Sequence, residues 1–289
     1  MADIKVALVG FGEAGRQHLQ ALGGTVGACP VAVVEDDREA VAVARSAGLE
    51  TRDMDQVLAD ESIRLVALCR PPEHRRPWIR PLMAAGKHLI LEAPPAQSAH
   101  ELCEVLFLTE RAQVLAGVMS HHRFTLPKDI WHGDPHRFAG AEAKLLVSRP
   151  TGVHYLDLAC QILGTPREVR TLPAGAAAPA AGVEVAASIR FESGAHLTLT
   201  VTSPTSPDDE RLLVRGATDW IDVRAGAVSG EVAGVPFSRP ARPAMLLRTA
   251  VYQEITDAVR GERRLDLAGL SRSTGVMRVL DALSPEGCA

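Results

Sequence analysis

The feature that most constrains the fold is an alternation of short apolar runs with amphipathic segments over the first 120 residues. The apolar runs predict β-strands at 4–9, 30–36, 62–70, 88–92 and 113–120. The segments between them predict helices at 16–24, 38–48, 77–87 and 98–112. Strands that alternate with helices form parallel sheets through right-handed crossovers, and strands apolar along their length indicate helices on both faces. Residues 1–122 are therefore predicted to form a doubly wound α/β domain.

The pattern changes after residue 122 and predicts a second domain, 123–289, of the α+β class with a largely antiparallel open sheet. A strand is expected at 141–148, a helix at 151–164, a hairpin at 183–203, a strand pair at 211–226 and an amphipathic helix at 248–260. The alanine- and proline-rich stretch 173–182 predicts a mobile surface loop.

Composition excludes several classes of function. The 289 residues carry a formal net charge of −4, which gives no electrostatic footprint for nucleic acid. No apolar run approaches the roughly 18 residues of a membrane span, and the N-terminus lacks the pattern of a secretory signal, so we expect a cytoplasmic protein. The five cysteines show no paired spacing, which predicts free thiols and neither a metal site nor disulfides.

A glycine-rich turn directly follows the first predicted strand and opens a helix. It matches G-x-G-x-x-G and consists of Gly10, Phe11, Gly12, Glu13, Ala14 and Gly15. In this motif the first glycine allows a tight turn, the second lets backbone approach a pyrophosphate, and the third lets helix and strand pack closely. The N–H groups at the start of the helix then face the phosphates. We therefore predict a dinucleotide site.

Acidic residues follow the second predicted strand. Glu35 lies 20 residues after Gly15, where a carboxylate accepts hydrogen bonds from the adenosine ribose, and Asp36 and Asp37 follow it. These charges favour NAD over NADP, although Arg38 nearby could accommodate a 2′-phosphate.

Several longer segments resemble the Gfo/Idh/MocA family of glucose-fructose oxidoreductase-like and inositol dehydrogenase-like proteins. They are VALVGFGEAGRQHLQAL, ALCRPPEHRRPWIRPLMAAGKHLILEAPPA, TGVHYLDLACQILG and IRFESGAHLTLTVTS. The resemblance implies a Rossmann domain joined to an α/β domain whose open sheet often mediates dimers or tetramers. It also implies hydride transfer at C4 of a nicotinamide, to or from a sugar or polyol carbon. In such proteins a lysine within Glu-Lys-Pro and a histidine of a later helix lie near the reacting hydroxyl.

The family's residues match this chain only in part. Glu92 and Pro94 match the Glu-Lys-Pro motif, but Ala93 replaces its lysine. His154 matches the helix histidine and Asp157 the acid after it, whereas Pro150 stands where the family often has an aspartate. The cofactor is further expected to meet the residues at the ends of the third and fourth strands: Cys69, Arg70, Pro71, His74, Glu92 and Ala93.

Alanine cannot exchange a proton, which leaves three explanations open. His154 can supply the proton instead, with Tyr155, His74, His121 and His122 as further candidates. Alternatively, the acceptor is an imine or a conjugated double bond that needs little acid help, and biliverdin reductase of the same fold family also lacks that lysine. In the third case the protein binds the nucleotide as a sensor and does not turn over.

The small-molecule substrate is expected to contact Ala93, His121, His122 and His154, with Arg70 as a clamp for a substrate carboxylate. Arg70 has a second interpretation, as one charge of a solvated basic run at the start of a helix. Little chain lies between Phe124 and Leu145 to close over a sugar, so the pocket is expected to be open or shaped for another ligand. A homo-oligomer, dimer or tetramer, is expected to form through the exposed face of the second sheet.

Overall fold

The computed structural model describes residues 3–127, 135–148, 152–173, 183–203 and 210–284. The chain divides into two compact units, one made of Met1–His121 with Pro243–Ser273 and the other of His122–Arg242 with Thr274–Ala289. The first unit gives way to the second between His121 and His122, next to the boundary expected at residue 122. The segment Pro243–Ser273, expected in the second domain, belongs to the first unit. The loop expected at 173–182 lies, from residue 174 on, outside the described residues.

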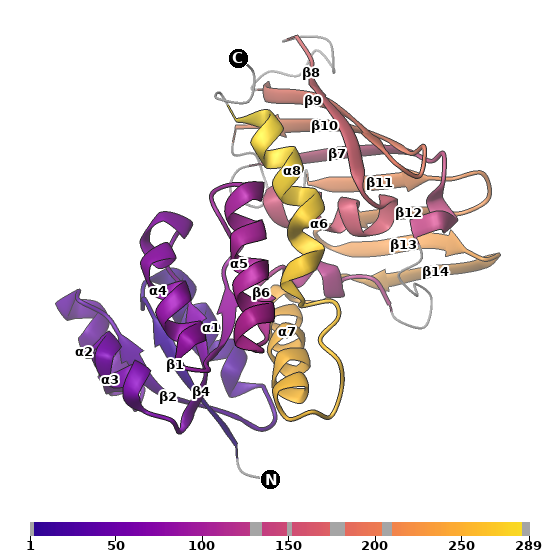
Figure 1. Cartoon of the computed structure of the whole chain (residues 1–289). Coiled ribbons are helices and arrows are strands. Elements are labelled where there is room, and N and C mark those ends of the chain that lie inside the picture. The colour runs from indigo at the N-terminus through magenta and orange to yellow at the C-terminus, as the bar shows by residue number, and fades with distance from the viewer. Residues whose placement is uncertain (1–2, 128–134, 149–151, 174–182, 204–209, 285–289) are drawn as a thin grey trace. The chain divides into compact units, whose positions relative to one another are not determined.

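The first unit contains a parallel sheet of six strands in the order β3-β2-β1-β4-β5-β6 (Figure 1). The strands are β1 (Ile4–Val9), β2 (Ala28–Val34), β3 (Glu50–Thr51), β4 (Ile63–Leu68), β5 (His88–Leu91) and β6 (Ala116–Val118). The chain runs outward from β1 to β3, crosses back, and runs outward again from β4 to β6. This is the strand order of a dinucleotide-binding doubly wound sheet, with its switch point between β1 and β4.

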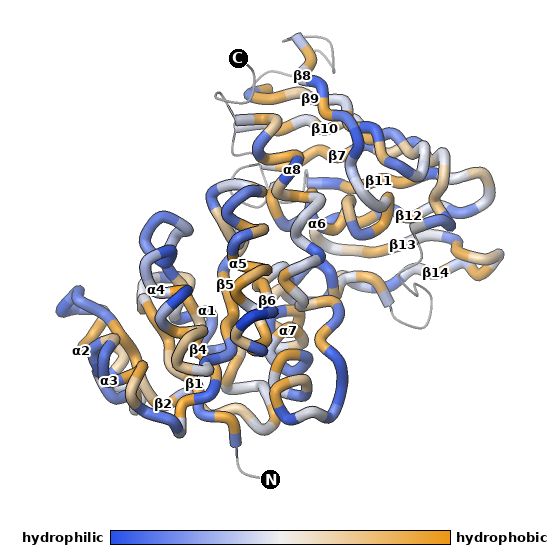
Figure 2. Tube along the Cα trace, in the orientation of Figure 1, coloured by the Kyte–Doolittle hydropathy of each residue, from blue (hydrophilic) through white to orange (hydrophobic). Residues whose placement is uncertain are grey.

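Helices connect these strands. They are α1 (Glu13–Gly23), α2 (Arg38–Ser46), α3 (Met54–Ala59), α4 (Pro72–Ala84) and α5 (Ala99–Ala112), and α7 (Ala244–Val259) joins them from far along the chain. Right-handed crossovers on either side of the switch point place α1 on one face and α4 and α5 on the other. The central strands are hydrophobic along their length (Figure 2), and β1 and β4 are buried except at their second residues. The predicted parallel sheet is confirmed.

Two local features of the first unit differ from the sequence prediction. The polar stretch before β4 forms β3 and α3, because Asp53 caps α3 and exchanges hydrogen bonds with Gln56 in a capping box. The helix expected at 77–87 begins earlier, at Pro72, and contains Pro77 and Pro81 in its interior. Burial of Arg75, Ile79, Leu82 and Met83 along one face outweighs the missing N–H groups of these prolines.

The second unit contains a sheet of eight strands in the order β14-β13-β12-β11-β7-β10-β9-β8. The strands are β7 (Glu142–Ser148), β8 (Pro166–Thr171), β9 (Val183–Phe191), β10 (His196–Thr202), β11 (Arg211–Arg215), β12 (Trp220–Arg224), β13 (Ala227–Val232) and β14 (Val235–Pro240). All pairs are antiparallel except β10 with β7. Two helices, α6 (Gly152–Leu163) and α8 (Thr274–Leu283), pack together and against this sheet. The predicted open antiparallel sheet is confirmed.

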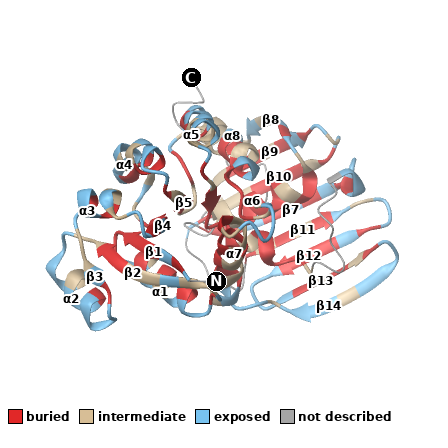
Figure 3. Ribbon diagram, turned by 60° about the horizontal axis from the view of Figure 1, so that its bottom comes forward, coloured by how far each residue is buried: buried red, intermediate tan, exposed pale blue. Residues whose placement is uncertain are grey.

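Along the strands of the second sheet, buried residues alternate with more exposed ones (Figure 3). Leu145, Leu199, Leu212 and Val223 are among the buried residues of the core beneath the sheet. The opposite face is mostly charged or hydroxyl-bearing, with Asp222 held between Arg211 and Arg224. Leu146, Leu213 and Trp220 lie on this face among the polar side chains.

Strands β8, β13 and β14 and helix α8 were not predicted. Strand β14 is mostly exposed, and β8 is a partly exposed edge strand rich in charged residues, so neither shows the apolar alternation of an inner strand. Helix α7 begins at Ala244, four residues before the predicted start at 248. Among the described residues, no helix is long and apolar enough to cross a membrane.

Candidate functional site

The glycine loop has the geometry that a dinucleotide requires. Gly10 adopts φ +94°, a conformation that side-chain-bearing residues rarely adopt, and Gly12 caps α1. A Cβ at Gly15 would lie 2.3 Å from the carbonyl oxygen of Gly10, so only glycine permits this close contact between helix and loop. A Cβ at Gly12 would meet nothing within 4 Å, which leaves open space beside the start of α1. Loop, helix start and space fit a bound pyrophosphate.

Glu35 stands one residue beyond β2 and is bound to the glycine loop. One carboxylate oxygen accepts from the N–H of Phe11 at 2.6 Å, and the other accepts from the N–H groups of Asp36 and Asp37 at 2.7 and 3.1 Å. Burial raises the pKa of Glu35, but these three donors and Arg70 outweigh burial, so its pKa lies below the usual value. Glu35 is therefore a carboxylate at neutral pH and stands where an adenosine ribose binds in this fold.

Glu92, directly after β5, belongs to a buried polar network of the first unit. Its Oε1 accepts from Nη1 of Arg248 on α7 at 2.9 Å and contacts Nε2 of His18 on α1 at 2.8 Å. The other ring nitrogen of His18 lies 2.5 Å from the hydroxyl of Tyr252, also on α7. His18 and Tyr252 are fully buried. Burial raises the pKa of Glu92, but His18 and Arg248 outweigh it and hold that pKa well below its usual range.

The loop after Glu92 is held from its other side by α4. Arg75, whose side chain is buried, donates from Nη2 to the carbonyl oxygen of Pro94 and from Nη1 to that of Arg70 at 3.3 Å. Ala93 thus lies in a loop fixed on both flanks and contributes no titratable group of its own. No other acid or base takes its place in the chain between Glu92 and Pro94.

The structure places the other predicted cofactor residues around the ends of β2 and β4. Arg38 begins α2 and is exposed, Pro71 caps α4, and His74 is exposed on the first turn of α4. Cys69 is buried, and burial raises the pKa of its thiol, so it is a packed thiol rather than a reactive one. His121 is buried in the first unit.

In the second unit, three of the predicted residues come together. The His122 ring lies 4.4 Å from the ring of Tyr155 and 5.9 Å from the ring of His154, measured between centroids. His154 and Tyr155 belong to α6, and His122 is the second residue of a short 3₁₀ helix, His121–Phe124, that follows β6. Burial, with a smaller contribution from Glu210, raises the pKa of Tyr155 to about 12, so its hydroxyl stays protonated and can donate a hydrogen bond.

Asp157, one turn after His154, is paired with Arg123. Nε of Arg123 lies 2.5 Å from Oδ2 and Nη2 lies 2.8 Å from Oδ1, and each side chain is 1% exposed. Both carboxylate oxygens of Asp157, the acid expected to act with His154 in catalysis, are thus bound to one guanidinium. We interpret Asp157 as a residue that fixes α6 relative to the 3₁₀ helix of His122.

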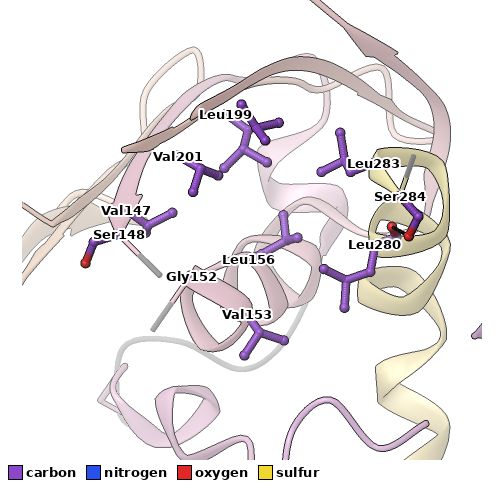
Figure 4. Close-up of a pocket in the computed structure, with 11 residues that line it drawn as sticks. Val147, Ser148, Gly152, Val153, Leu156, Leu199, Val201, Leu280, Leu283 and Ser284 are labelled. Carbon is purple, nitrogen blue, oxygen red and sulfur yellow. Dashed lines mark hydrogen bonds between the residues drawn. The ribbon is translucent and has the colours of Figure 1, made fainter. Parts of the chain in front are cut away.

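A separate cavity of about 330 Å³ lies between α6, α8 and the sheet of the second unit (Figure 4). Val153, Leu156, Leu199 and Leu280 are among the apolar side chains that line it. His122, His154 and Tyr155 are not among the residues that line it. The cavity therefore does not contain the imidazole cluster.

Several residues of the site could not be found by reading the sequence. His18, Arg248 and Tyr252 carry the Glu92 network, and Arg123 holds Asp157. His18 follows Gly15 by three residues, the one local signal among them. Arg248 lies 156 residues from Glu92 in the chain, and Tyr252 lies 234 residues from His18, so only the fold brings these together. No group of three or more His, Cys, Asp or Glu residues able to hold a metal is present in the described part of the chain.

Comparison with known proteins agrees with this geometry. Residues 4–120 match the Gfo/Idh/MocA family model, described as an oxidoreductase family with an NAD-binding Rossmann fold. The whole chain resembles solved dehydrogenases and oxidoreductases at low identity.

A UDP-N-acetylglucosamine 3-dehydrogenase, GnnA, from Acidithiobacillus ferrooxidans is 18% identical with a TM-score of 0.78, over 96% of this chain and 95% of that one. The WlbA dehydrogenase from Bordetella pertussis, in complex with NADH and UDP-GlcNAcA, is 18% identical with a TM-score of 0.76, over 99% and 96% of the two chains. An oxidoreductase from Agrobacterium radiobacter, in complex with NAD+, L-tartaric acid and magnesium, is 16% identical with a TM-score of 0.78, again over 99% and 96%. These likenesses show that both units share the fold of such enzymes. Residues 4–120 are thus similar to the Gfo/Idh/MocA oxidoreductase family, which has an NAD-binding Rossmann fold.

Proposed function

We propose that the protein is an NAD-dependent reductase whose acceptor is an imine or a conjugated double bond. The main support for this proposal is that the loop after β5 lacks a group that can exchange a proton with the substrate. Ala93 has no proton to exchange, and the carboxylate of Glu92 is bound by His18 and Arg248 with a depressed pKa. That loop therefore offers no acid or base for a hydroxyl near neutral pH.

The chemistry of the acceptor follows from this loss. Oxidation of an alcohol requires a base at the hydroxyl while hydride leaves, and such positioned acid–base catalysis contributes roughly 10²–10⁴ in rate. An iminium carbon already carries the positive charge that attracts hydride. A conjugated double bond delocalises the charge that hydride brings. Either acceptor needs less help from a proton donor than a sugar carbonyl does. The nicotinamide, when bound, supplies the hydride, and the chain supplies position and at most one proton.

The cluster on α6 supports a proton source of this limited kind. His154 and His122 are imidazoles, which exchange protons near neutral pH, and Tyr155 is a neutral phenol that can orient an acceptor by a hydrogen bond. We therefore assign the proton to His154, with His122 beside it. Asp157 acts on this pair through Arg123 rather than on the substrate.

Two observations favour a second function, as a sugar or polyol dehydrogenase with His154 as the base. His154 is brought beside a second imidazole, so the site retains proton-exchanging groups although Ala93 has none. Two of the similar structures are named for UDP-sugar chemistry or contain a UDP-sugar. In this case the reaction would run from alcohol and NAD+ to ketone and NADH.

The direction and acceptor of turnover distinguish these functions. The full-length protein is incubated with NADH and a panel of acceptors that includes a cyclic imine and a cyclic enone. In parallel it is incubated with NAD+ and a panel of polyols, sugars and a UDP-sugar. NADH oxidation that depends on the imine or enone, without NAD+ reduction, is the expected result. NAD+ reduction by a sugar or polyol alone establishes the second function. Binding of NADH without turnover on either panel contradicts both the reductase and the dehydrogenase. The protein would then be a nucleotide-binding sensor.

Two variants locate the proton source. His154→Gln is expected to lower kcat about 10²-fold or more and to remove the neutral-pH limb of the pH–rate profile. The matched control is His100→Gln, because His100 is an exposed residue of α5 whose Nε2 lies 3.6 Å from the carboxylate of Glu104. Ala93→Lys restores the amine of the family motif. If it gains polyol dehydrogenase activity, the pocket still accepts a sugar and the proposed acceptor is wrong.

The homo-oligomer predicted through the outer face of the second sheet stays a prediction. Its apolar members are Leu146, Leu213 and Trp220, set among ion pairs that a partner would have to cover. Sedimentation of the wild type and of Trp220→Lys is the direct measurement. A dimer that Trp220→Lys dissociates would support this surface.

A further inference from the structure

Arg70 extends away from the loop of β5 and toward the acids that follow β2. Its side chain crosses the glycine loop so closely that a Cβ at Gly10 would lie 2.8 Å from its Cγ. Beyond that point, Nη2 donates to Oδ2 of Asp36 at 3.2 Å and lies 3.6 Å from Oε1 of Glu35. The guanidinium therefore lies at the adenosine end of a Rossmann site. This position differs from that of a clamp for a substrate carboxylate, which the sequence predicts for Arg70.

The three acids at this end are not equivalent. Three of the roughly four acceptor positions of Glu35 are taken by the N–H groups of Phe11, Asp36 and Asp37. The carboxylate of Asp37 caps α2 by accepting from the N–H of Ala40. The side chain of Asp36 is 91% exposed, and among the described residues its carboxylate is paired with Arg70 alone. One carboxylate is thus both free to move into solvent and bound to a cation.

The pair has the chemistry of a selector for the adenosine 2′ position. An arginine beside this ribose can bind a 2′-phosphate by two parallel hydrogen bonds, and a neighbouring carboxylate repels the same phosphate. Arg70 follows β4, on the other side of the switch point from β2. The residues that follow β2 in the sequence therefore do not indicate that an arginine lies beside them. The exposed Asp36 competes with the phosphate for one guanidinium.

We propose that Arg70 is the residue that reads the adenosine 2′-phosphate, so that the site takes NADP(H) as well as NAD(H), and that Asp36 opposes it by occupying the same guanidinium. With a 2′-hydroxyl, Arg70 stays on Asp36. With a 2′-phosphate, Arg70 leaves Asp36 and pairs with the phosphate. This inference rests on the proposed function in one respect, because it requires that a dinucleotide binds at the glycine loop. It does not require that the protein reduces any acceptor.

Calorimetric titrations with NADH and NADPH test this directly. They are made on the full-length wild type, Arg70→Ala, Asp36→Asn, the double variant and Arg38→Ala. The control is Arg76→Ala, because Arg76 lies on α4 with its side chain 60% exposed, and it pairs with Glu101 and Glu104 at 3.7 Å. Thermal unfolding of each variant confirms that it is folded.

Arg70→Ala is expected to weaken NADPH at least ten-fold and NADH less than three-fold. Asp36→Asn is expected to tighten NADPH several-fold in the wild type but not in the Arg70→Ala background, because both effects act through one guanidinium. The proposal is overturned if Arg70→Ala weakens both nucleotides equally or neither, if Arg38→Ala carries the selective loss, or if the wild type does not bind NADPH. Failure of the proposed reductase function shows separately, as nucleotide binding without turnover.

Discussion

Arg123 and Asp157 form a two-point ion pair in the second unit, with Nε to Oδ2 at 2.5 Å, Nη2 to Oδ1 at 2.8 Å, and each side chain 1% exposed. The pair joins α6 to the 3₁₀ helix that carries His122. Both imidazoles of the candidate site therefore depend on it for their relative position.

Removing one partner of this pair should destabilise the protein strongly. Asp157→Ala removes a buried counter-charge that accepts two hydrogen bonds from the guanidinium of Arg123, which costs about 3–5 kcal/mol in the free energy of unfolding. Urea denaturation measures this loss. Arg123→Met combined with Asp157→Leu removes both charges and should recover most of it. A loss below about 1 kcal/mol in Asp157→Ala would show that the pair is solvated and that our interpretation of Asp157 is wrong.

Two glycines of the nucleotide loop should respond differently to alanine. Gly12→Ala adds a methyl group to open space, so the free energy of unfolding should change by less than about 1 kcal/mol, while NADH binding weakens at least ten-fold because the pyrophosphate is displaced. Gly15→Ala places Cβ 2.3 Å from the carbonyl oxygen of Gly10, so both stability and binding should fall. Calorimetry with NADH and thermal unfolding, made on the same samples, separate the two effects. Equal NADH affinity in Gly12→Ala and wild type would show that the pyrophosphate does not approach this loop.

His88 should make stability fall as the pH falls from about 6.5 to about 4. Burial, with a contribution from Arg64, lowers the pKa of His88 to about 4 from 6.5. Its Nδ1 accepts from the N–H of Leu115 at 2.9 Å, a bond that only the neutral ring can form. Between these two pH values the unfolded chain binds the proton first, so acidification favours unfolding. Urea midpoints measured across this range should show a flatter slope for His88→Gln. A slope equal to that of the wild type would exclude His88 as the cause.

Glu92 should stabilise the protein in a lower pH window. Burial raises the pKa of Glu92, but His18 and Arg248 outweigh burial and hold that pKa well below the usual 4.5. A group with a depressed folded pKa contributes its full stability above about pH 4.5 and loses it as the pH falls below that value. Glu92→Gln should lower stability at pH 7 by about 2–3 kcal/mol, because Arg248 loses a charged acceptor, and should flatten the acid limb below pH 4.5. Acid titration of unfolding, followed by fluorescence, checks both effects. An acid limb as steep as that of the wild type would place the responsible carboxylate elsewhere.

The local parts of the site could be read from the sequence, because their requirements are local. Gly10, Gly12 and Gly15 follow a strand and open a helix at fixed spacing, and the structure shows the positive φ and the close contact that the spacing implies. The turn at Gly194 joins β9 and β10 as the hairpin pattern predicted. Ser98 begins the predicted helix 98–112 and caps α5 by accepting from the N–H of Glu101. In a full capping box the side chain of Glu101 would accept from the N–H of Ser98. Here it accepts from the N–H of Gln97, one residue earlier.

What the sequence by itself determined is therefore the class of fold, the phosphate loop and the absence of a proton-exchanging group at Ala93. Each depends on periodicity, on the conformational freedom of glycine or on the identity of a single residue. Only the tertiary structure decided that Arg70 pairs with Asp36, that Glu92 is held by Arg248 and His18, and that His122 packs on Tyr155. These contacts join strands, helices and loops that are distant in the chain. Long-range packing in the folded core selects such partners, and no local pattern encodes that selection.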